Sequence, residues 1–430
     1  MISRRALVVS AILCLAGYAW VYANGLAQAP IRSDGFSYYV YLPSWFLFGD
    51  TTLAAVARDC CGGEFPEFTA IIRWPGTRRW VNAHPIGVAI MQTPFFAVAH
   101  GLTKWSNLSP DGFTLYYQHA AGLAGLAWTV AGLAVLRRLL LDSFSERITA
   151  ATLVAILFGT NLFHYATFDS SYSHPYSFFL FTSFMYLTAR WHREPAAATS
   201  VLLGIVAGLI VLVRHTNGLI LMVFPLYGIG VNRTFRDAVL LPFAHPRELL
   251  RIALVGALVI LPQLLIYYQA TGRPIVSSYG DLGFHWTDPK IFSVLFGTQK
   301  GLFFWSPVLL AAVVGLVLLL RSRRPAAAFV PAGVVFLLVN TYVIASWWDW
   351  QFGGSYGHRG FVDILPLFAL GLAAFFAWAE RRRVTIAMTA TVAVVLILLS
   401  TFQMIQYWYG IVPFSDTTWD QYRELFLEWR

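Results

Sequence analysis

Apolar runs of roughly 18 or more residues recur along the whole chain, and each is long enough to cross a bilayer as a helix. Only 12% of the 430 residues are Asp, Glu, Lys or Arg, against about 25% in an ordinary soluble domain. These observations exclude a soluble protein and predict a single integral membrane domain over residues 1–430. The net charge of +9 does not indicate a nucleic-acid partner, because the basic residues cluster between apolar runs, as topology signals do.

The apolar pattern predicts an all-α polytopic membrane protein with about 11 transmembrane helices. Their expected ranges are 6–24, 115–136, 149–166, 174–189, 198–213, 217–231, 252–270, 306–320, 326–346, 361–379 and 385–408. The first run resembles a signal peptide, but its apolar stretch is too long for one, so we expect it to remain as the first helix.

Charge sets the expected orientation. With the N-terminus inside, 17 of the 30 Lys and Arg residues fall in short cytoplasmic loops, which the positive-inside rule favours. They are Arg4, Arg5, Arg137, Arg138, Arg147, Arg190, Arg193, Arg233, Arg236, Arg247, Arg251, Arg321, Arg323, Arg324, Arg381, Arg382 and Arg383. To keep this distribution, the apolar segment 85–102 must lie in the outer interface rather than span.

The predicted map is asymmetric, because the outer face receives all the long connections. These are a first outer loop with juxtamembrane helices (25–114), a second outer loop (271–305), a Trp/Gly-rich loop (346–360) and an amphipathic tail (409–430). No internal repeat or paired broken helix of the secondary-transporter kind is visible. The sequence therefore predicts chemistry at the outer membrane surface.

The first candidate for that chemistry is Asp34, which follows the first span and begins a probable helix with Tyr38 one turn later. A carboxylate just above the lipid headgroups is positioned to take a proton from an acceptor hydroxyl. The alternative is that Asp34 caps its own helix through the first amide groups.

Basic groups follow two other apolar segments. Arg214 stands in a tight outer connection, where an arginine commonly needs an anionic partner or marks a substrate path. It alternatively snorkels to headgroups or pairs with a carboxylate. His84 opens the interfacial segment and either donates to a phosphate or simply starts a helix.

The loop 346–360 combines tryptophans with four glycines, followed by His358 and Arg359. Glycines let backbone N–H groups approach an oxyanion, and an adjacent guanidinium can bind it through two hydrogen bonds. Trp348 and its neighbours are alternatively an interfacial aromatic belt.

The remaining candidates are smaller. Asp169 and His174 are either helix-start signals or substrate contacts, and Tyr279 and Lys300 either contact a sugar or phosphate or belong to a solvated turn. Cys60 and Cys61 form an adjacent disulfide or remain two thiols. No HExxH or Cys/His metal spacing is present, so the sequence does not support a metal-dependent hydrolase.

These features together resemble the GT-C glycosyltransferases that use polyprenyl-phosphate sugars. The features are a first helix with Asp34 directly after it, a Pro-rich interfacial helix, the Arg214-His215-Thr216 element and a late Trp/Gly-rich outer loop. The branch most similar is that of bacterial protein O-mannosyltransferases and the lipid A aminoarabinose transferase, of the glycosyltransferase family 39 type. Many members have a lysine where this chain has His84, and no second acidic residue follows Asp34 at once.

The resemblance implies an inverting transferase at the periplasmic face of a bacterial inner membrane. Asp34 would be the catalytic base, and Arg214, Arg359, His84 and His358 would bind the donor phosphate. The expected partners are a polyprenyl-phosphate-linked sugar, membrane lipids, and a glycan, lipid or protein acceptor, without a required metal cofactor. Tyr38, Asp169, His174, Tyr279, Lys300 and Trp348 are the expected sugar or acceptor contacts. The alternatives are a carrier or flippase of lipid-linked saccharides and a structural membrane protein.

Overall fold

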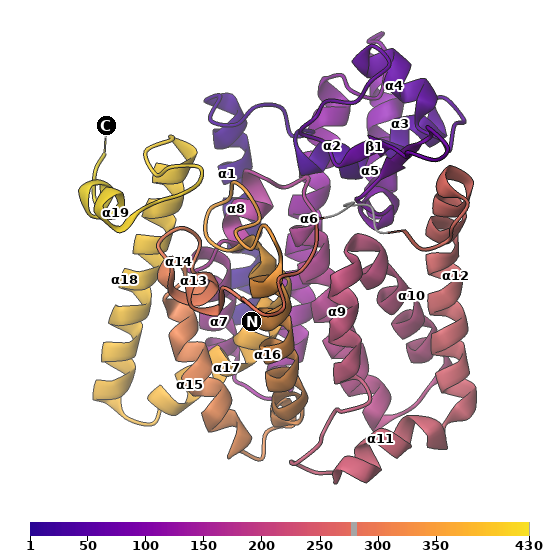
Figure 1. Cartoon of the computed structure of the whole chain (residues 1–430). Helices are drawn as coiled ribbons and strands as arrows, with labels where there is room; N and C mark the ends of the chain where they lie inside the picture. Colours follow the sequence, from indigo (N-terminus) through magenta and orange to yellow (C-terminus); the bar gives the residue numbers. More distant parts are fainter. Residues whose placement is uncertain (277–281, 430) are drawn as a thin grey trace.

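The computed structural model describes residues 1–276 and 282–429, and most of them are helical. Figure 1 shows a bundle of helices with a compact group of short elements over one end. Six of the described helices are long and apolar enough to cross a membrane. They are α1 (Ile2–Ala23), α6 (Leu115–Leu141), α12 (Pro246–Thr271), η2–α16 (Pro325–Ser346), η3–α17 (Arg359–Ala379) and α18 (Arg383–Trp408). Two shorter apolar helices, α10 (Ala197–Val213) and α15 (Val308–Leu320), join them.

The expected count of about 11 spanning helices is not confirmed. The predicted span 149–166 is divided into α7 (Glu146–Phe158) and α8 (Leu162–Thr167), and α9 (His174–Arg193) follows. The prediction of an α-helix over 217–231 was wrong, because this segment contains the 3-10 helix η1 (His215–Val223) and then turns. Backbone outside an α-helix is tolerated at membrane depth where neighbouring protein satisfies its polar groups.

Residues 25–114 fold into the group of short elements at the top of Figure 1, which we call the cap. It contains α2 (Asp34–Tyr39), α3 (Tyr41–Phe46), α4 (Ala54–Cys61), β1 (Ile71–Arg73), β2 (Trp80–Asn82) and α5 (Gly87–Trp105). The two strands pair antiparallel, with Ile72 opposite Val81. The cap has a hydrophobic cluster of its own, and Cys60 and Cys61 at the end of α4 are joined by a disulfide.

The C-terminal tail also folds against the bundle. The predicted amphipathic helix over the tail is short, because α19 covers only Trp419–Leu425. Thr418 and Gln421 form a capping box at its start, in which each side chain binds the backbone N–H of the other residue. The helices α11 (Phe235–Ala244), α13 (Ile291–Phe296) and α14 (Leu302–Trp305) complete the described elements.

Small residues let the long helices approach closely. The pairs α15 with α17, α10 with α12, and α6 with α9 make the most extensive contacts. A Cβ atom added to Gly315 of α15 would lie 1.8 Å from the carbonyl oxygen of Gly371 in α17, so the two backbones touch at this crossing. This contact holds α17, which carries the η3 segment discussed below.

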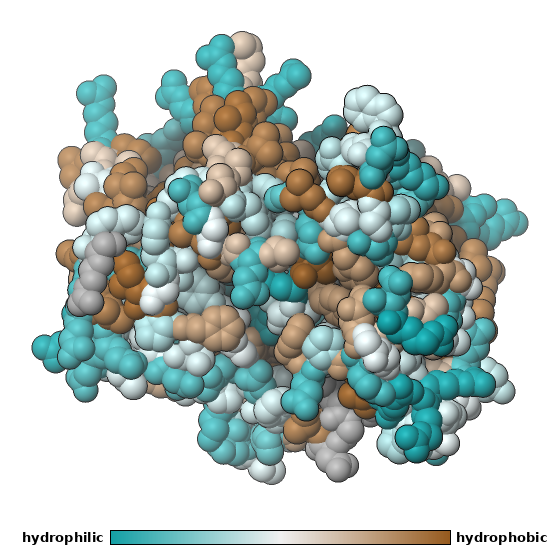
Figure 2. Space-filling model, turned by 90° about the horizontal axis from the view of Figure 1, so that it is seen from above, coloured by the Kyte–Doolittle hydropathy of each residue, from teal (hydrophilic) through white to brown (hydrophobic). Residues whose placement is uncertain are grey.

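Figure 2 looks down on the end of the molecule that carries the cap. Hydrophilic side chains project from most of its outline, and hydrophobic residues gather in the upper middle and at the left and right (Figure 2).

Candidate active site

Asp34 and Arg359 lie in contact although 325 residues separate them in the sequence. The Arg359 Nη1 atom donates to the Asp34 Oδ2 atom over 2.8 Å. Asp34 is the first residue of α2, and Arg359 begins η3. The Asp34 side chain remains 26% exposed, so a ligand can reach the carboxylate. The side chain of the N-cap residue, Ser33, makes no capping hydrogen bond, and the Asp34 carboxylate faces Arg359 instead.

Local backbone geometry places Asp34 there. Ser33 has a φ of +48°, in the left-handed region that non-glycine residues rarely adopt. Gly35 follows, and a Cβ atom at this position would lie 2.1 Å from the Ser171 Oγ atom. Because glycine has no side chain, α2 can approach the loop before α9 closely enough to bring Asp34 to η3.

Asp34 is held as an anion. Burial opposes ionisation of its carboxyl group, but the Arg359 guanidinium, with smaller contributions from His84 and His174, outweighs burial. The pKa of Asp34 therefore lies below its ordinary value. The carboxylate is charged at neutral pH, as a proton acceptor must be.

His84 borders the same carboxylate. Its ring packs edge-on against the Tyr38 ring with 4.4 Å between centroids, and the Tyr41 hydroxyl donates to its carbonyl oxygen over 2.9 Å. Burial, with smaller contributions from Arg359 and Arg214, outweighs the opposing Asp34 charge and lowers the pKa of His84 to about 4. The ring is therefore neutral at pH 7. Its buried Nδ1 atom has no hydrogen-bond partner among the described residues.

A second carboxylate, Asp363, lies one turn after Arg359 on η3, and three side chains surround it. Its oxygens lie 3.4 Å from the Arg214 Nη1 atom and 3.0 Å from the His174 Nδ1 atom, and the Asn217 amide donates to one of them over 3.1 Å. The Asp363 side chain is 2% exposed. Arg214 also lies over the Phe352 ring, 5.2 Å from its centroid.

Asp363 was not among the sequence candidates, although a signal for it was present. It is a single carboxylate inside the apolar run 361–379, and ionisable residues inside membrane spans are commonly functional. Arg359, which pairs with Asp34, and Asp363, which pairs with Arg214, both lie on η3, so the two ion pairs belong to one site.

Asp169 has a different surrounding. It lies 2.7 Å from the Arg32 Nη2 atom and 2.9 Å from the His164 Nε2 atom. Arg32 donates to the Phe168 carbonyl oxygen as well, over 2.9 Å. Burial opposes the charge on Asp169, but Arg32 and His164 hold its pKa at about 2. These contacts join the segment before α2 to the segment before α9.

The remaining candidates lie in the outer loops. The buried ammonium of Lys300 donates to the carbonyl oxygens of Ser355 and, over 2.9 Å, Phe414, so it joins the Trp/Gly-rich loop to the tail. Burial and, to a smaller extent, the Arg359 charge lower the pKa of Lys300 to about 8.

The two ring nitrogens of His358 also face backbone groups. Nε2 pairs with the Trp350 carbonyl oxygen over 2.9 Å, and Nδ1 accepts from the Gly360 N–H. Trp348 is 44% exposed, and its backbone N–H donates to the Gly283 carbonyl oxygen. Tyr279 lies outside the described residues.

Arginines neutralise the acidic side chains at the site. Within residues 1–276 and 282–429, no group of three His, Cys, Asp or Glu side chains is arranged to hold a metal ion. Asp34, Asp363 and Asp169 are each paired with an arginine, which supplies the positive charge that a metal would otherwise provide. Arg359 and Arg214 are in turn suited to bind a phosphate.

Comparison with known proteins identifies a fold. No family model matches the chain, and no curated protein sequence matches it. Among solved structures, the chain is similar to the apo form of the oligosaccharyltransferase of Archaeoglobus fulgidus, with a TM-score of 0.52 and 12% sequence identity. The likeness covers 99% of this chain and 60% of the archaeal chain, so this chain spans about 60% of that protein's length. The protein therefore has an oligosaccharyltransferase-like fold.

Proposed function

We propose that the protein is an inverting GT-C glycosyltransferase that moves a sugar from a polyprenyl-phosphate donor to an acceptor hydroxyl. The observation that carries the proposal is the contact between Asp34 and Arg359, because it joins an accessible carboxylate to a phosphate-binding type of side chain. The oligosaccharyltransferase-like fold supports glycosyl transfer as the reaction class.

In this mechanism the donor phosphate first engages Arg359. The buried Nε atom of this guanidinium has no hydrogen-bond partner among the described residues, while Nη1 is bound to Asp34. A phosphate oxygen that binds at Nε, together with a second at an adjacent Nη, would complete the bidentate geometry that arginine prefers. The phosphate would then take part of the positive charge that now neutralises Asp34.

Donor binding would in this way make Asp34 a better base. With Arg359 neutralised by phosphate, burial of the carboxyl group is less opposed, so the pKa of Asp34 would rise toward the working pH. General-base efficiency is greatest when the catalytic pKa lies near that pH. Substrate binding and base activation would be coupled through one guanidinium.

The chemical step is a direct displacement at the anomeric carbon. The acceptor oxygen forms a bond to C1 while the bond from C1 to the phosphate oxygen breaks, and Asp34 accepts the hydroxyl proton. The leaving group is polyprenyl phosphate, and one displacement inverts the anomeric configuration. Arg359 and Arg214, with the open Nδ1 side of His84, stabilise the charge that grows on the leaving oxygens.

The contacts divide the candidates for substrate binding. Tyr38 packs on His84 beside Asp34, and we keep it as a substrate contact. His174 is bound to Asp363 within the protein, so we assign it to the positioning of that carboxylate. Asp169, Lys300 and His358 are bound within the protein, so we assign them to its architecture and not to the substrate.

The orientation that follows from the charge distribution places the cap outside. We propose that the protein lies in a bacterial inner membrane with its N-terminus in the cytoplasm. The arginine-rich loops at the ends of α15 and α17 would then face the cytoplasm, and Asp34 would face the periplasm. A lipid-linked sugar could reach the site from the outer leaflet without leaving the bilayer.

A transfer assay in proteoliposomes tests the proposal. The protein is supplied with labelled polyprenyl-phosphate hexoses and pentoses and with short hydroxyl acceptors, and donor consumption and the product anomer are followed. We expect the protein to consume one of the donors and to form a product with the inverted anomeric configuration. The Asp34→Asn variant should neither consume donor nor form product. Movement of intact donor between leaflets without cleavage would instead support a flippase and overturn the proposal.

A further inference from the structure

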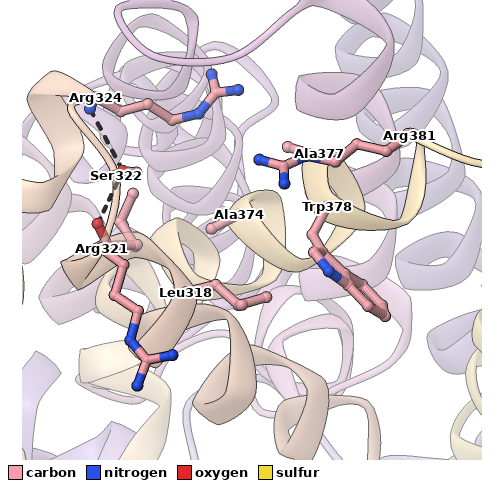
Figure 3. A pocket seen from close by; sticks show the side chains of 9 residues that line it. Leu318, Arg321, Ser322, Arg324, Ala374, Ala377, Trp378 and Arg381 are labelled. Atoms are coloured by element: carbon pink, nitrogen blue, oxygen red, sulfur yellow. Dashed lines mark hydrogen bonds between the residues drawn. The ribbon is translucent and has the colours of Figure 1, made fainter.

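A second polar site lies at the far end of the η3–α17 segment from Arg359. A pocket of about 320 Å³ opens between the ends of α15 and α17 (Figure 3). Its lining residues are Leu318, Leu319, Arg321, Ser322, Arg324, Ala374, Ala377, Trp378 and Arg381. The segment from Arg359 to Arg381 spans about 30 Å at the rise of a helix, so this pocket is separate from the Asp34 site.

The lining contains three arginines and no acidic residue. In Figure 3 the guanidinium of Arg381 reaches from the end of α17 toward Arg324, while that of Arg321 points away from both. Arg324 is held in place, because it donates to the Ser143 carbonyl oxygen and lies over the Phe144 ring. The Arg381 side chain has no ion-pair or hydrogen-bond partner among the described residues.

Such an arrangement suits an anion with several oxygen acceptors. Guanidinium groups brought together repel one another unless a negative charge lies between them, and phosphate accepts hydrogen bonds from two arginines at once. Arg323, Arg382 and Arg383 follow in the same loops but do not line the pocket, and Glu380 precedes Arg381 in the sequence. The charge thus favours a phosphate group.

The apolar part of the lining favours a lipid over a free phosphate as the ligand of this pocket. Ala374 and Ala377 lie beside the arginines, and Trp378 is 42% exposed at the edge of the pocket. On α15 the apolar side chain of Val314, one turn before the lining residue Leu318, is 51% exposed. An acyl chain can lie along this helix face while its headgroup occupies the pocket, whereas a free phosphate would leave the apolar surface unused.

We propose that this pocket binds the headgroup phosphate of an anionic phospholipid. Arg381 and Arg324 bind the phosphate oxygens, Trp378 packs on the glycerol region, and the exposed face of α15 carries the chain. The site does not depend on the glycosyltransferase proposal, because no residue is shared between the two.

Native mass spectrometry of the delipidated protein in detergent tests this site. Phosphatidylglycerol, phosphatidylcholine and inorganic phosphate are titrated separately. We expect one tightly bound phosphatidylglycerol, with weaker binding of the other two. Arg381→Ala should weaken it about tenfold or more, as expected for a lost charge-assisted hydrogen bond. The matched control Arg382→Ala removes the same charge outside the pocket and should change binding less than about twofold.

A second variant keeps the arginines of the pocket and removes its volume. Ala377→Leu fills the pocket and leaves every arginine in place, so it should also abolish tight phosphatidylglycerol binding. Equal losses in Arg381→Ala and Arg382→Ala would show a diffuse basic surface and overturn the proposal. Undiminished binding in Ala377→Leu, or equal affinity for inorganic phosphate, would overturn it as well.

Discussion

The site contains two ion pairs, Asp34–Arg359 and Asp363–Arg214, and the two carboxylates differ in their exposure and in the number of their partners. Asp34 is 26% exposed and faces Arg359 at 2.8 Å. Asp363 is 2% exposed and is shared among Arg214, His174 and Asn217. An accessible ion pair can exchange one partner for a ligand, whereas a closed one holds its partners in place. We therefore propose that Asp34 transfers the proton and that Asp363 positions Arg214.

The largest effect should come from Asp34→Asn, which keeps the shape of the side chain and removes the base. We expect turnover to fall by about 10²- to 10⁴-fold with donor affinity nearly intact. Single-turnover sugar transfer and donor titration measure the two quantities. Asp59→Asn, an exposed position in the same cap, is the control and should transfer at the normal rate. Normal transfer by Asp34→Asn would end the assignment of the base.

Arg359→Lys should have the next largest effect, because lysine keeps the charge but cannot bind phosphate with two parallel hydrogen bonds. Loss of one charge-assisted hydrogen bond, about 1.5 to 3 kcal/mol, corresponds to roughly 10- to 100-fold in kcat/KM. Steady-state kinetics at varied donor concentration measures it. Arg58→Ala, at an exposed position of α4, supplies the control. An unchanged kcat/KM in Arg359→Lys would remove Arg359 from the donor site.

Asp363→Asn should have a smaller effect, confined to the placement of Arg214. We expect donor affinity to fall by about tenfold or less, with a lesser change in kcat. A double-mutant cycle separates this role from a general loss of structure. In an Arg214→Ala background, Asp363→Asn should cause little further loss, because residues that act as a unit are not additive. Full additivity of the two losses would show that Asp363 does not act through Arg214.

The pH profile should show the smallest change. Asp34 is active when ionised, so transfer falls as pH drops through its pKa. In the free enzyme Arg359 holds that pKa low, and donor phosphate relieves this effect. The fall of kcat at low pH reports the pKa of Asp34 in the donor complex, and the fall of kcat/KM reports its pKa in the free enzyme. The midpoint for kcat should therefore lie about one pH unit or more above the midpoint for kcat/KM. If kcat and kcat/KM fall at the same pH, the donor phosphate does not replace Asp34 as the partner of Arg359.

Sequence reasoning found the residues on both sides of the Asp34–Arg359 pair but not the contact itself. Asp34 stood out because it follows the first apolar run, and Arg359 because it follows a glycine-rich outer loop. Their contact depends on Ser33 and Gly35, which turn α2 toward η3. A tertiary contact over 325 residues has no local pattern that would reveal it.

Two features of the fold depend on the surrounding protein and could not be predicted from local sequence. Lys300 and His358 have the residue types of ligand-binding groups, but their polar atoms bind nearby backbone groups within the folded loops. The apolar segment 217–231 satisfies the composition of a spanning helix, but it forms a 3-10 helix and turns, in which Gly228 donates to Ala328. Composition specifies which residues leave water, and the surrounding protein decides which conformation and which partners they take.

The most direct test of the account is a cryo-electron microscopy structure of the protein in nanodiscs with bound polyprenyl phosphate, the leaving group of the reaction. We predict density for the phosphate within hydrogen-bond distance of Arg359, beside Arg214, with the Asp34 carboxylate released from Arg359 and facing the vacated sugar position. A phosphate bound elsewhere, with the Asp34–Arg359 pair intact, would contradict the account.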